Sequence, residues 1–216
     1  MRRTKEDAEQ TRLKIIAAAL ELFSRNGYSN TTLAMIANSA GFSRGPIYWH
    51  FKNKDELYEA VLAYSQAPLE QLIARSRKLA DEPLVALEHF IDDWFRLLLE
   101  DRWYRQSFEI LLNMTELTAQ MASTLKRERK LTRDMVQLLE ALVERSQQTP
   151  GTGNCQSPRS LALLLYSSLM GITHTWLLSP KLFSLREQTP FMASNLLALM
   201  TSHAPSSVTS QASEGA

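Results

Sequence analysis

The sequence has little of several features that define protein classes. It contains a single cysteine, Cys155, so no intrachain disulfide can form and a reducing compartment is expected. It has only 7 glycines and 8 prolines, which favours long helices over a loop-rich β fold. Its formal net charge is only +1, so the charge balance alone does not indicate a nucleic-acid partner. The basic residues near the N-terminus have no apolar stretch behind them, so no signal peptide is expected.

Sequence signatures of catalysis are also missing. Neither a Walker phosphate loop nor a dinucleotide-binding glycine fingerprint occurs. His89 with Asp92 or Asp93 has the spacing of metal ligands on a helix, but two such side chains on one surface helix more often simply face water. Cys155 has no neighbouring histidine or basic residue to activate its thiol. We therefore expect neither an enzyme nor a bound metal or cofactor.

The most informative stretch runs from Thr31 to Asp55. Its apolar residues at positions 33, 36, 37 and 40 predict a short helix, which a threonine begins and Gly41 ends in the left-handed conformation. Ser43 then stands where a second helix would begin. Two short helices joined by so tight a turn must cross steeply, as they do in a helix-turn-helix. The second helix, residues 44–50, is too polar to be buried and suits insertion into a groove of DNA.

This stretch resembles the DNA-binding domain of the TetR family of bacterial transcriptional repressors. The family pattern, roughly T-x-x-x-I-A-x-x-A-G-x-S-x-G-x-I-Y-x-H-F-x-x-K-x-x-L, is met from Thr32 through Leu57. The opening M-R-R-T-K-E-D-A-E-Q-T-R and the R-G-x-I-Y-W-H-F run are most similar to the repressors of multidrug-efflux operons. Beyond residues 4–62 the resemblance is one of length, helical pattern and a G-x-x-x-x-W-L-x-x-P run. It implies a homodimer that a small molecule releases from its operator.

The residues expected to face DNA follow from the exposed helix and from this resemblance. Arg44 can contact a guanine edge through two hydrogen bonds, and Gly45 lets the backbone approach the groove. Pro46 lies in the first helical turn, where its missing N–H costs nothing. Lys54 begins the next helix, where its charge and the free backbone N–H groups suit a phosphate. The full set expected at the DNA interface is Thr31, Thr32, Ser43, Arg44, Gly45, Pro46, Tyr48, Trp49, His50, Lys52 and Lys54.

The expected fold class is all-α, with a three-helix helix-turn-helix DNA-binding domain followed by a six-helix ligand-binding and dimerisation domain. The expected divisions are a flexible basic arm over 1–10, the DNA-binding domain over 11–56, the second domain over 57–202 and a disordered tail over 203–216. The core of the first domain is expected to hold Ile16, Leu20, Phe23, Leu33, Ile36, Ile47 and Phe51. Helices are expected over 11–26, 53–79, from 81 onward, and over 102–114, 117–145, 158–178 and 189–201. The helix over 53–79 would link the two domains mechanically.

The second domain carries weaker sequence signals. The resemblance implies a ligand cavity among its helices, and a cavity lined by methionines and aromatic residues with one carboxylate suits bulky, apolar, often cationic compounds. Polar candidates for fixing a ligand are Glu109, Asn113 and His174, although each fits a core or interface polar residue equally well. The full set expected to contact the ligand is Trp94, Trp103, Phe108, Glu109, Asn113, Tyr166, Met170 and His174.

The segment from Ser160 to Pro180 has no charged residue and is long enough to cross a bilayer. Its hydroxyl groups and His174 make it too polar for that role, so a helix buried at a protein interface is the better interpretation. With the helix Thr189–Thr201, the helix Pro158–Leu178 is expected to form a four-helix bundle between two copies of the chain. The expected partners are a pseudo-palindromic double-stranded DNA operator and a small-molecule inducer, in the cytoplasm. Two alternatives stay open, a TetR-type regulator of a metabolite or signalling molecule and a DNA-binding protein without a ligand.

Overall fold

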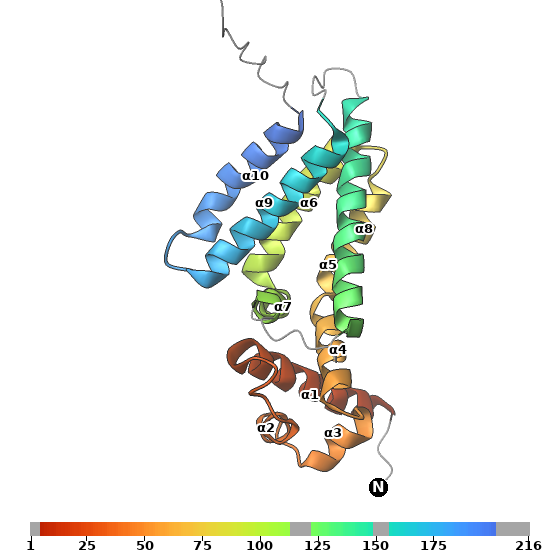
Figure 1. The fold of residues 1–216 in the computed structure, drawn as a ribbon, viewed down its shortest axis with the longest axis vertical. Helices are drawn as coiled ribbons and strands as arrows, with labels where there is room; N and C mark the ends of the chain where they lie inside the picture. The colour runs from red at the N-terminus through yellow and green to blue at the C-terminus, as the bar shows by residue number, and fades with distance from the viewer. Residues whose placement is uncertain (1–4, 113–121, 149–155, 202–216) are drawn as a thin grey trace, which may run out of the picture.

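The structure is a computed structural model that describes residues 5–112, 122–148 and 156–201. Its described residues form ten α-helices and no strand, which confirms the all-α fold class (Figure 1). The helices are α1 (Lys5–Asn26), α2 (Leu33–Ser39), α3 (Arg44–His50), α4 (Lys54–Ser65), α5 (Ala67–Lys78), α6 (Pro83–Glu100), α7 (Arg102–Leu112), α8 (Ala122–Gln147), α9 (Pro158–Leu178) and α10 (Leu185–Thr201). Residues 1–4 of the arm expected over 1–10, Cys155 and the tail expected over 203–216 lie outside the described residues. Residues 5–10 of that arm are helical instead of flexible, because α1 already begins at Lys5.

Helices α1 to α4 form a small unit around its own apolar core, at the lower end of Figure 1. Every residue expected in this core is buried except Leu33, which is half-buried against it. Helix α4 extends the same core with Leu57, Val61 and Leu62, and α7 adds Ile110. The packing of the first unit therefore continues beyond residue 56.

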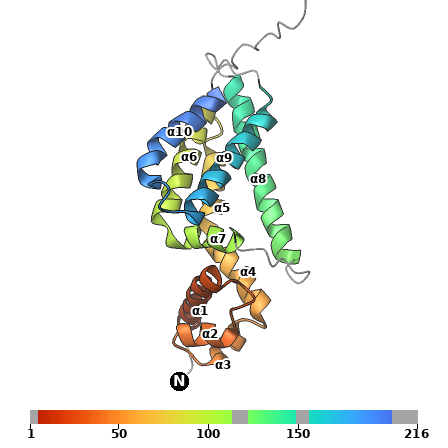
Figure 2. The same cartoon turned by 60° about the vertical axis from the view of Figure 1, so that its left-hand side comes forward.

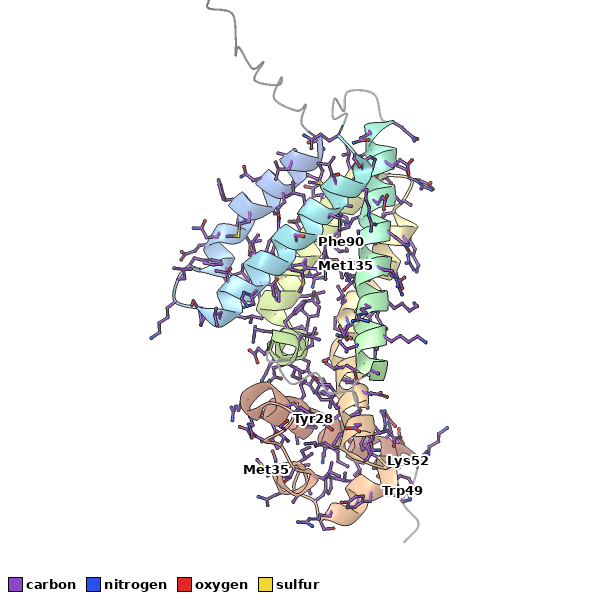
Figure 3. All side chains as sticks on the ribbon, viewed as in Figure 1. Tyr28, Met35, Trp49, Lys52, Phe90 and Met135 are labelled. Carbon is purple, nitrogen blue, oxygen red and sulfur yellow. The ribbon has the colours of Figure 1, made fainter. Side chains whose placement is uncertain are left out.

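Helices α5 to α10 form the second unit, whose core lies mainly between α6, α8 and α9. Phe90 of α6 and Met135 of α8 mark this core in Figure 3. Helix α10 covers α6 and α9 from the outside, as the two views in Figures 1 and 2 agree. The side chains of α6 that point inward, Phe90 and Trp94, are fully buried. The opposite side of the same helix is exposed.

The single helix expected over 53–79 is in fact two helices, α4 and α5, which meet at Gln66. Pro68 explains the break. In a continuous helix its ring would clash with the backbone carbonyl four residues earlier, and its nitrogen carries no proton to donate to that carbonyl. Pro68 lies in the first turn of α5, where neither property is costly. Helix α10 also differs from expectation, since it begins at Leu185, where the Ser184 hydroxyl accepts a hydrogen bond from the backbone N–H of Glu187.

One described helix, α9, is long and apolar enough to cross a membrane by length and composition. Its most apolar window has a mean hydropathy of 1.4, and 28% of that window is buried inside the chain. Leu163 and Leu164 lie among its exposed residues. The inward side of α9 is the one that carries Leu165 and Leu169, both fully buried.

Candidate DNA-binding and ligand-binding sites

The turn between α2 and α3 has the local geometry that the sequence predicts. The Thr32 hydroxyl caps α2 by accepting a hydrogen bond from the backbone N–H of Met35 at 3.2 Å. Gly41 has a φ of 74°, a left-handed conformation that a residue with a side chain rarely adopts. Ser43 precedes α3 in an extended conformation, but its hydroxyl makes no capping hydrogen bond. A cap at the start of α2 and a left-handed glycine after it therefore shape the turn that leads into α3.

Helix α3 buries one face and exposes the other. Ile47 is fully buried in the core of the first unit, whereas Tyr48 is 57% exposed and Trp49 is 72% exposed. Arg44 and Gly45 are exposed at the start of the helix. In Figure 3, Trp49 lies at the end of the molecule far from the helical bundle of the second unit. An exposed helix with a cation at its start and two aromatic side chains is thus presented away from the rest of the chain.

Residues 46 and 50–53 complete this region. Pro46 and His50 are half-buried, and the His50 ring lies edge-on to the Trp49 ring with 4.5 Å between the centroids. The side chain of Lys52 is exposed, and its backbone N–H donates to a carboxylate oxygen of Glu56 at 2.7 Å. The Asn53 side chain accepts from the backbone N–H of Glu56 at 2.8 Å. This reciprocal arrangement is a variant of the capping box that the sequence suggests at the start of α4.

Two residues expected at the DNA interface turn inward instead. Thr31 is fully buried, and its hydroxyl donates to the backbone oxygens of Gly27 at 2.8 Å and Leu22 at 3.3 Å. The prediction that Thr31 contacts DNA is therefore wrong, because the residue holds the α1–α2 turn together. The Lys54 ammonium donates to the backbone oxygens of Tyr28 at 2.9 Å and of Thr31 at 3.0 Å. Its charge is occupied within the fold, so the expected phosphate contact through this side chain is not supported.

The same turn is tied to α4 through Tyr28. The Tyr28 hydroxyl donates to Asp55, and the Lys54 ammonium lies 4.0 Å from the centroid of the Tyr28 ring. Burial, followed by the hydrogen bond to Asp55, raises the pKa of Tyr28. The ring also packs against Phe23 and edge-on against Tyr58. These contacts hold the turn between α1 and α2 against α4, the helix that leads toward the second unit.

Three aromatic side chains meet in the core of the second unit. The Phe108 ring lies 5.5 Å from that of Trp94 and 5.0 Å from that of Tyr104, measured between centroids. The Trp94 indole N–H donates to the Thr173 hydroxyl at 3.0 Å, and Thr173 in turn donates to the backbone oxygen of Leu169 at 2.8 Å. Of the residues expected to contact a ligand, Trp94 and Phe108 are thus brought together by α6 and α7.

Tyr104 and Thr173 belong to this cluster although sequence reasoning did not select them. Tyr104 is fully buried, and among the described residues its hydroxyl has no hydrogen-bond partner. Burial raises the pKa of Tyr104 well above its ordinary value. A buried hydroxyl without a partner is unusual in folded proteins and marks a place where a ligand group could bind. Nothing in the sequence distinguishes this tyrosine from an ordinary core residue.

The other residues expected around a ligand are spread over different surroundings. Tyr166 and Met170 are half-buried on α9, and the Tyr166 hydroxyl shares a 3.3 Å hydrogen bond with that of Thr132. Glu109 is half-buried, and burial raises the pKa of its carboxyl while Arg105 and Arg102 lower it. Asn113 lies outside the described residues.

Two of the residues expected to contact a ligand lie away from the aromatic cluster. Trp103 packs against the core of the first unit, with its ring 4.6 Å from that of Tyr64 between centroids, because it lies on the opposite side of α7 from Phe108. His174 is exposed on α9, since the inward positions of that helix are taken by apolar residues and Thr173. Neither side chain reaches the aromatic cluster around Trp94.

Helix α7 touches the cores of both units. Phe108 belongs to the core of the second unit and Ile110 to that of the first. The Gln106 amide donates to the Ser24 hydroxyl of α1 at 3.5 Å, and Arg102 forms a 3.6 Å ion pair with Glu21. Helix α7 therefore connects the surroundings of Phe108 directly to α1. In the part of the chain that the structure describes, no three His, Cys, Asp or Glu side chains gather as a metal site would require.

A helix-turn-helix with an exposed second helix, carried on a separate helical bundle, defines a DNA-binding transcriptional regulator. Comparison with known proteins agrees. Residues 15–61 match the bacterial regulatory proteins of the tetR family, and residues 82–202 match the C-terminal region of the MAATS-type transcriptional repressors. The chain belongs to the TetR family, which confirms the resemblance seen in the sequence.

Individual relatives cover most of the chain. The regulator AcrR of Shigella flexneri is 28% identical over 188 residues, which is 87% of each chain. The regulator TtgR of Pseudomonas putida is 35% identical over 185 residues, 83% of this chain and 86% of that one. The crystal structure of NalD of Pseudomonas aeruginosa superposes with a TM-score of 0.74 at 30% identity, covering 88% of this chain and 95% of that one. These relatives are regulators rather than enzymes.

Proposed function

We propose that the protein is a homodimeric repressor of a multidrug-efflux operon and that a small hydrophobic molecule releases it from its operator. The observation that carries this proposal is the likeness to efflux repressors across both units. NalD is a repressor of the MexAB-OprM multidrug efflux pump, and SmeT, whose structure is also similar, is the repressor of the SmeDEF pump. The chain acts by binding, in the cytoplasm where DNA is found, and we assign it no catalytic step.

The DNA-facing surface is formed by the exposed residues of α3 and its flanks. Arg44 reads a base edge in the major groove, and Gly45 lets the helix backbone approach closely. Tyr48, Trp49 and Lys52 contact the sugar-phosphate backbone, since they lie on the same exposed side and carry hydroxyl, indole and ammonium groups. The DNA-binding unit comprises α1 to α4, because these helices share one core.

Dimerisation uses the exposed apolar surface of α9 and α10. Phe191 is 66% exposed and Leu199 is 48% exposed on one side of α10, and both line a hollow of about 520 Å³ together with Gly171 of α9. Exposed apolar side chains concentrated on two adjacent helices are typical of a protein interface. A second copy of the same surface would cover them and place two recognition helices on one operator.

The inducer binds in the second unit next to the cluster of Trp94, Tyr104 and Phe108. This cluster offers aromatic surface and one buried hydroxyl without a partner among the described residues. Helix α7 carries two of the three rings and also packs on α1, so a ligand that displaces Phe108 moves the DNA-binding unit. The ligand needs only to bind the DNA-free arrangement better than the DNA-bound one. A 100-fold preference, about 2.7 kcal/mol, would lower operator affinity by the same factor.

The test begins with selection of the operator from random DNA by the purified protein. Binding of that operator is then measured by fluorescence anisotropy with and without efflux substrates, including triclosan, which occupies a solved complex of SmeT. We expect a pseudo-palindromic operator, loss of about 1–3 kcal/mol of binding energy in Arg44→Ala, and release by at least one compound while the dimer stays intact. Failure of the wild-type chain to select any sequence would overturn the proposal. Selection without release by any efflux substrate would leave a regulator of another ligand class.

A further inference from the structure

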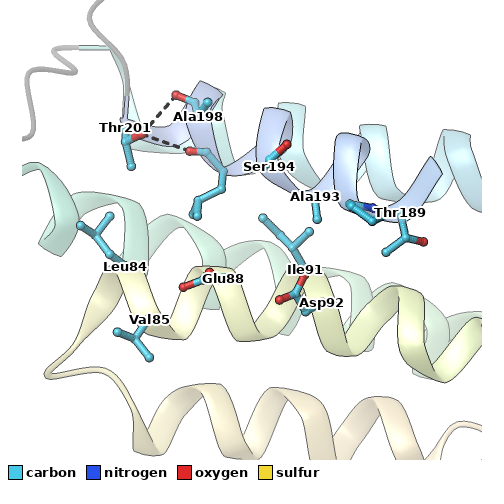
Figure 4. A pocket seen from close by; sticks show the side chains of 12 residues that line it. Leu84, Val85, Glu88, Ile91, Asp92, Thr189, Ala193, Ser194, Ala198 and Thr201 are labelled. Carbon is cyan, nitrogen blue, oxygen red and sulfur yellow. Dashed lines mark hydrogen bonds between the residues drawn. The ribbon is translucent and has the colours of Figure 1, made fainter. Parts of the chain in front are cut away.

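A groove of about 710 Å³ runs between α6 and α10 on the outside of the second unit (Figure 4). It is separate from the aromatic cluster, because Glu88 and Asp92 of α6 face the groove while Phe90 and Trp94 of the same helix point into the core. Ile91 and Ala193 form part of its apolar lining, from opposite walls. The groove is thus a second concave surface that the proposed repressor function does not use.

The groove combines apolar walls with charge of one sign. Leu84 and Val85 of α6 and Leu197 of α10 contribute aliphatic surface. Glu88 and Asp92 stand one helical turn apart on α6, and among the described residues no lysine, arginine or histidine lines the groove. Two like charges at this spacing repel each other, so a cation bound between them would be favoured.

Asp93, next to Asp92 in the sequence, differs from the two groove carboxylates because it forms ion pairs with arginines. Asp93 pairs with Arg96 at 2.6 Å and with Arg75 at 3.3 Å, outside the groove. In the described ranges, by contrast, neither Glu88 nor Asp92 makes a hydrogen bond or ion pair with a basic side chain. Burial, and then the charge of Glu88, raise the pKa of Asp92, while the nearby His89, which does not line the groove, lowers it.

The groove stays open in the proposed dimer. Phe191, Asn195 and Leu199 of α10 line the hollow assigned to the partner copy. Ala193 and Leu197 line the groove, and their positions lie on the opposite side of the same helix. A partner docked on the first side therefore leaves the second side in contact with solvent.

We propose that this groove binds an amphiphilic organic cation, whose apolar body lies on the aliphatic walls and whose charge lies between Glu88 and Asp92. A neutral ligand of the same shape would cover the two carboxylates without compensating their charge. An anion would be repelled by both. The site adds to the proposed function and does not depend on it, since it involves neither the DNA-facing surface nor the aromatic cluster.

The test uses two probes of the same shape and opposite charge, tetraphenylphosphonium and tetraphenylborate, titrated calorimetrically into the full-length protein. We expect the phosphonium to bind and the borate to bind at least about tenfold more weakly, because two carboxylates attract the first and repel the second. Affinity for the phosphonium should fall as salt is raised, since the groove is open to solvent. Equal binding of the two probes would overturn the proposal.

Variants locate the site. Glu88→Gln combined with Asp92→Asn preserves shape and removes both charges, and we expect about a tenfold loss of phosphonium affinity. Asp93→Asn removes a charge from the same helix outside the groove and should change that affinity less than about twofold. Ser194→Trp, at the exposed rim, should block binding by filling the groove. Phosphonium binding that survives both groove variants would place the probe elsewhere and overturn the proposal.

The same variants separate this proposal from the repressor function. The Glu88→Gln, Asp92→Asn double variant should keep its operator affinity and its response to triclosan, because neither involves the groove. If it loses phosphonium binding and still represses, both proposals hold. If the wild type binds no operator but the phosphonium result stands, only the repressor function fails. A change of oligomeric state in Ser194→Trp, measured by sedimentation, would make the groove an interface between copies and overturn the cation site.

Discussion

The Gln66 side-chain amide donates to both carboxylate oxygens of Glu128, at 2.8 and 3.0 Å. Gln66 is only 2% exposed and stands at the break between α4 and α5, whereas Glu128 lies on α8. Burial raises the pKa of Glu128, and the hydrogen bond from Gln66 lowers it. A partly buried charge is therefore held by one amide, at the point where the DNA-binding unit joins the bundle.

Replacing Gln66 by leucine should destabilise the protein. The change removes a hydrogen bond to a charged group and leaves the Glu128 carboxylate with less compensation, so we expect a loss of about 1.5–3 kcal/mol in the free energy of unfolding. Urea unfolding measures it as a lower midpoint at an unchanged slope. Glu128→Gln is the matched control, because its amide oxygen still accepts from Gln66. Equal midpoints for Gln66→Leu and the wild type would show that this contact contributes nothing.

The pH dependence of stability should differ between the wild type and Glu128→Gln. A carboxyl whose pKa is raised in the folded state binds more protons folded than unfolded, so stability falls as pH rises above its ordinary pKa of 4.5. The glutamine variant lacks this penalty. We expect the two proteins to differ least near pH 4.5 and the variant to gain relative to the wild type toward pH 7, in urea unfolding at several pH values. A difference that is constant across this range would contradict the shifted pKa.

The helix-turn-helix could be predicted in detail because its signals are local. A capping threonine, a glycine in the left-handed conformation and an apolar period of three to four residues each act within a few positions. The roles of Thr31 and Lys54 could not be predicted from the sequence, since they depend on contacts with residues that are distant in the sequence and close in the fold. The Lys54 ammonium reaches carbonyl oxygens more than twenty residues earlier, which only the packing of α1 against α4 brings close.

In the second unit, the positions of most helices could be predicted from the sequence, but the faces that they bury could not. The helix Pro158–Leu178 is apolar on nearly all sides, so its sequence does not tell which leucines point inward. The structure buries Leu165 and Leu169 and exposes Leu163 and Leu164. The same ambiguity explains why His174 was expected inside. Conversely, the break at Gln66 had a local signal in Pro68, which outweighs the helical period around it.

Two lysines near the start of α4 should respond oppositely to substitution. Lys54→Met keeps the aliphatic stem but removes the ammonium from two carbonyl oxygens, so it should cost about 1.5–3 kcal/mol of stability and leave the salt dependence of operator binding unchanged. Lys52→Met should leave stability unchanged and lower the slope of log affinity against log salt by about 0.9, the effect of one lost phosphate contact. Unfolding curves and operator titrations at several salt concentrations check both. Reversed results would make Lys54 the phosphate contact.

The dimer should depend on the exposed side of α10. Phe191→Glu places a charge on a side chain that is 66% exposed, so the folded protomer should persist while the dimer dissociates. Sedimentation and circular dichroism measure the two properties separately. Met35→Glu, an exposed apolar residue of α2, is the control and should remain dimeric. Leu169→Glu would not be informative, because that side chain is fully buried within the protomer. A dimeric Phe191→Glu would place the interface on another surface.

Removing the Tyr104 hydroxyl should stabilise the ligand-free protein and weaken its response to the inducer. The hydroxyl is buried and has no hydrogen-bond partner in the described part of the chain, so Tyr104→Phe should relieve a desolvation cost of about 1 kcal/mol and raise the melting temperature by about 2–4 °C. A ligand that satisfies this hydroxyl loses a hydrogen bond in the variant, so its stabilisation of the protein should shrink.

Tyr166→Phe is the matched control for this last change. Its hydroxyl shares a hydrogen bond with Thr132, so removing it should lower the melting temperature instead. Thermal unfolding of the three proteins, each with and without triclosan, gives both quantities in one experiment. A rise for Tyr104→Phe with an undiminished triclosan shift would place the inducer away from the aromatic cluster. A fall in the ligand-free melting temperature would mean that the hydroxyl has a partner in the folded protein, and the cluster would then be ordinary core.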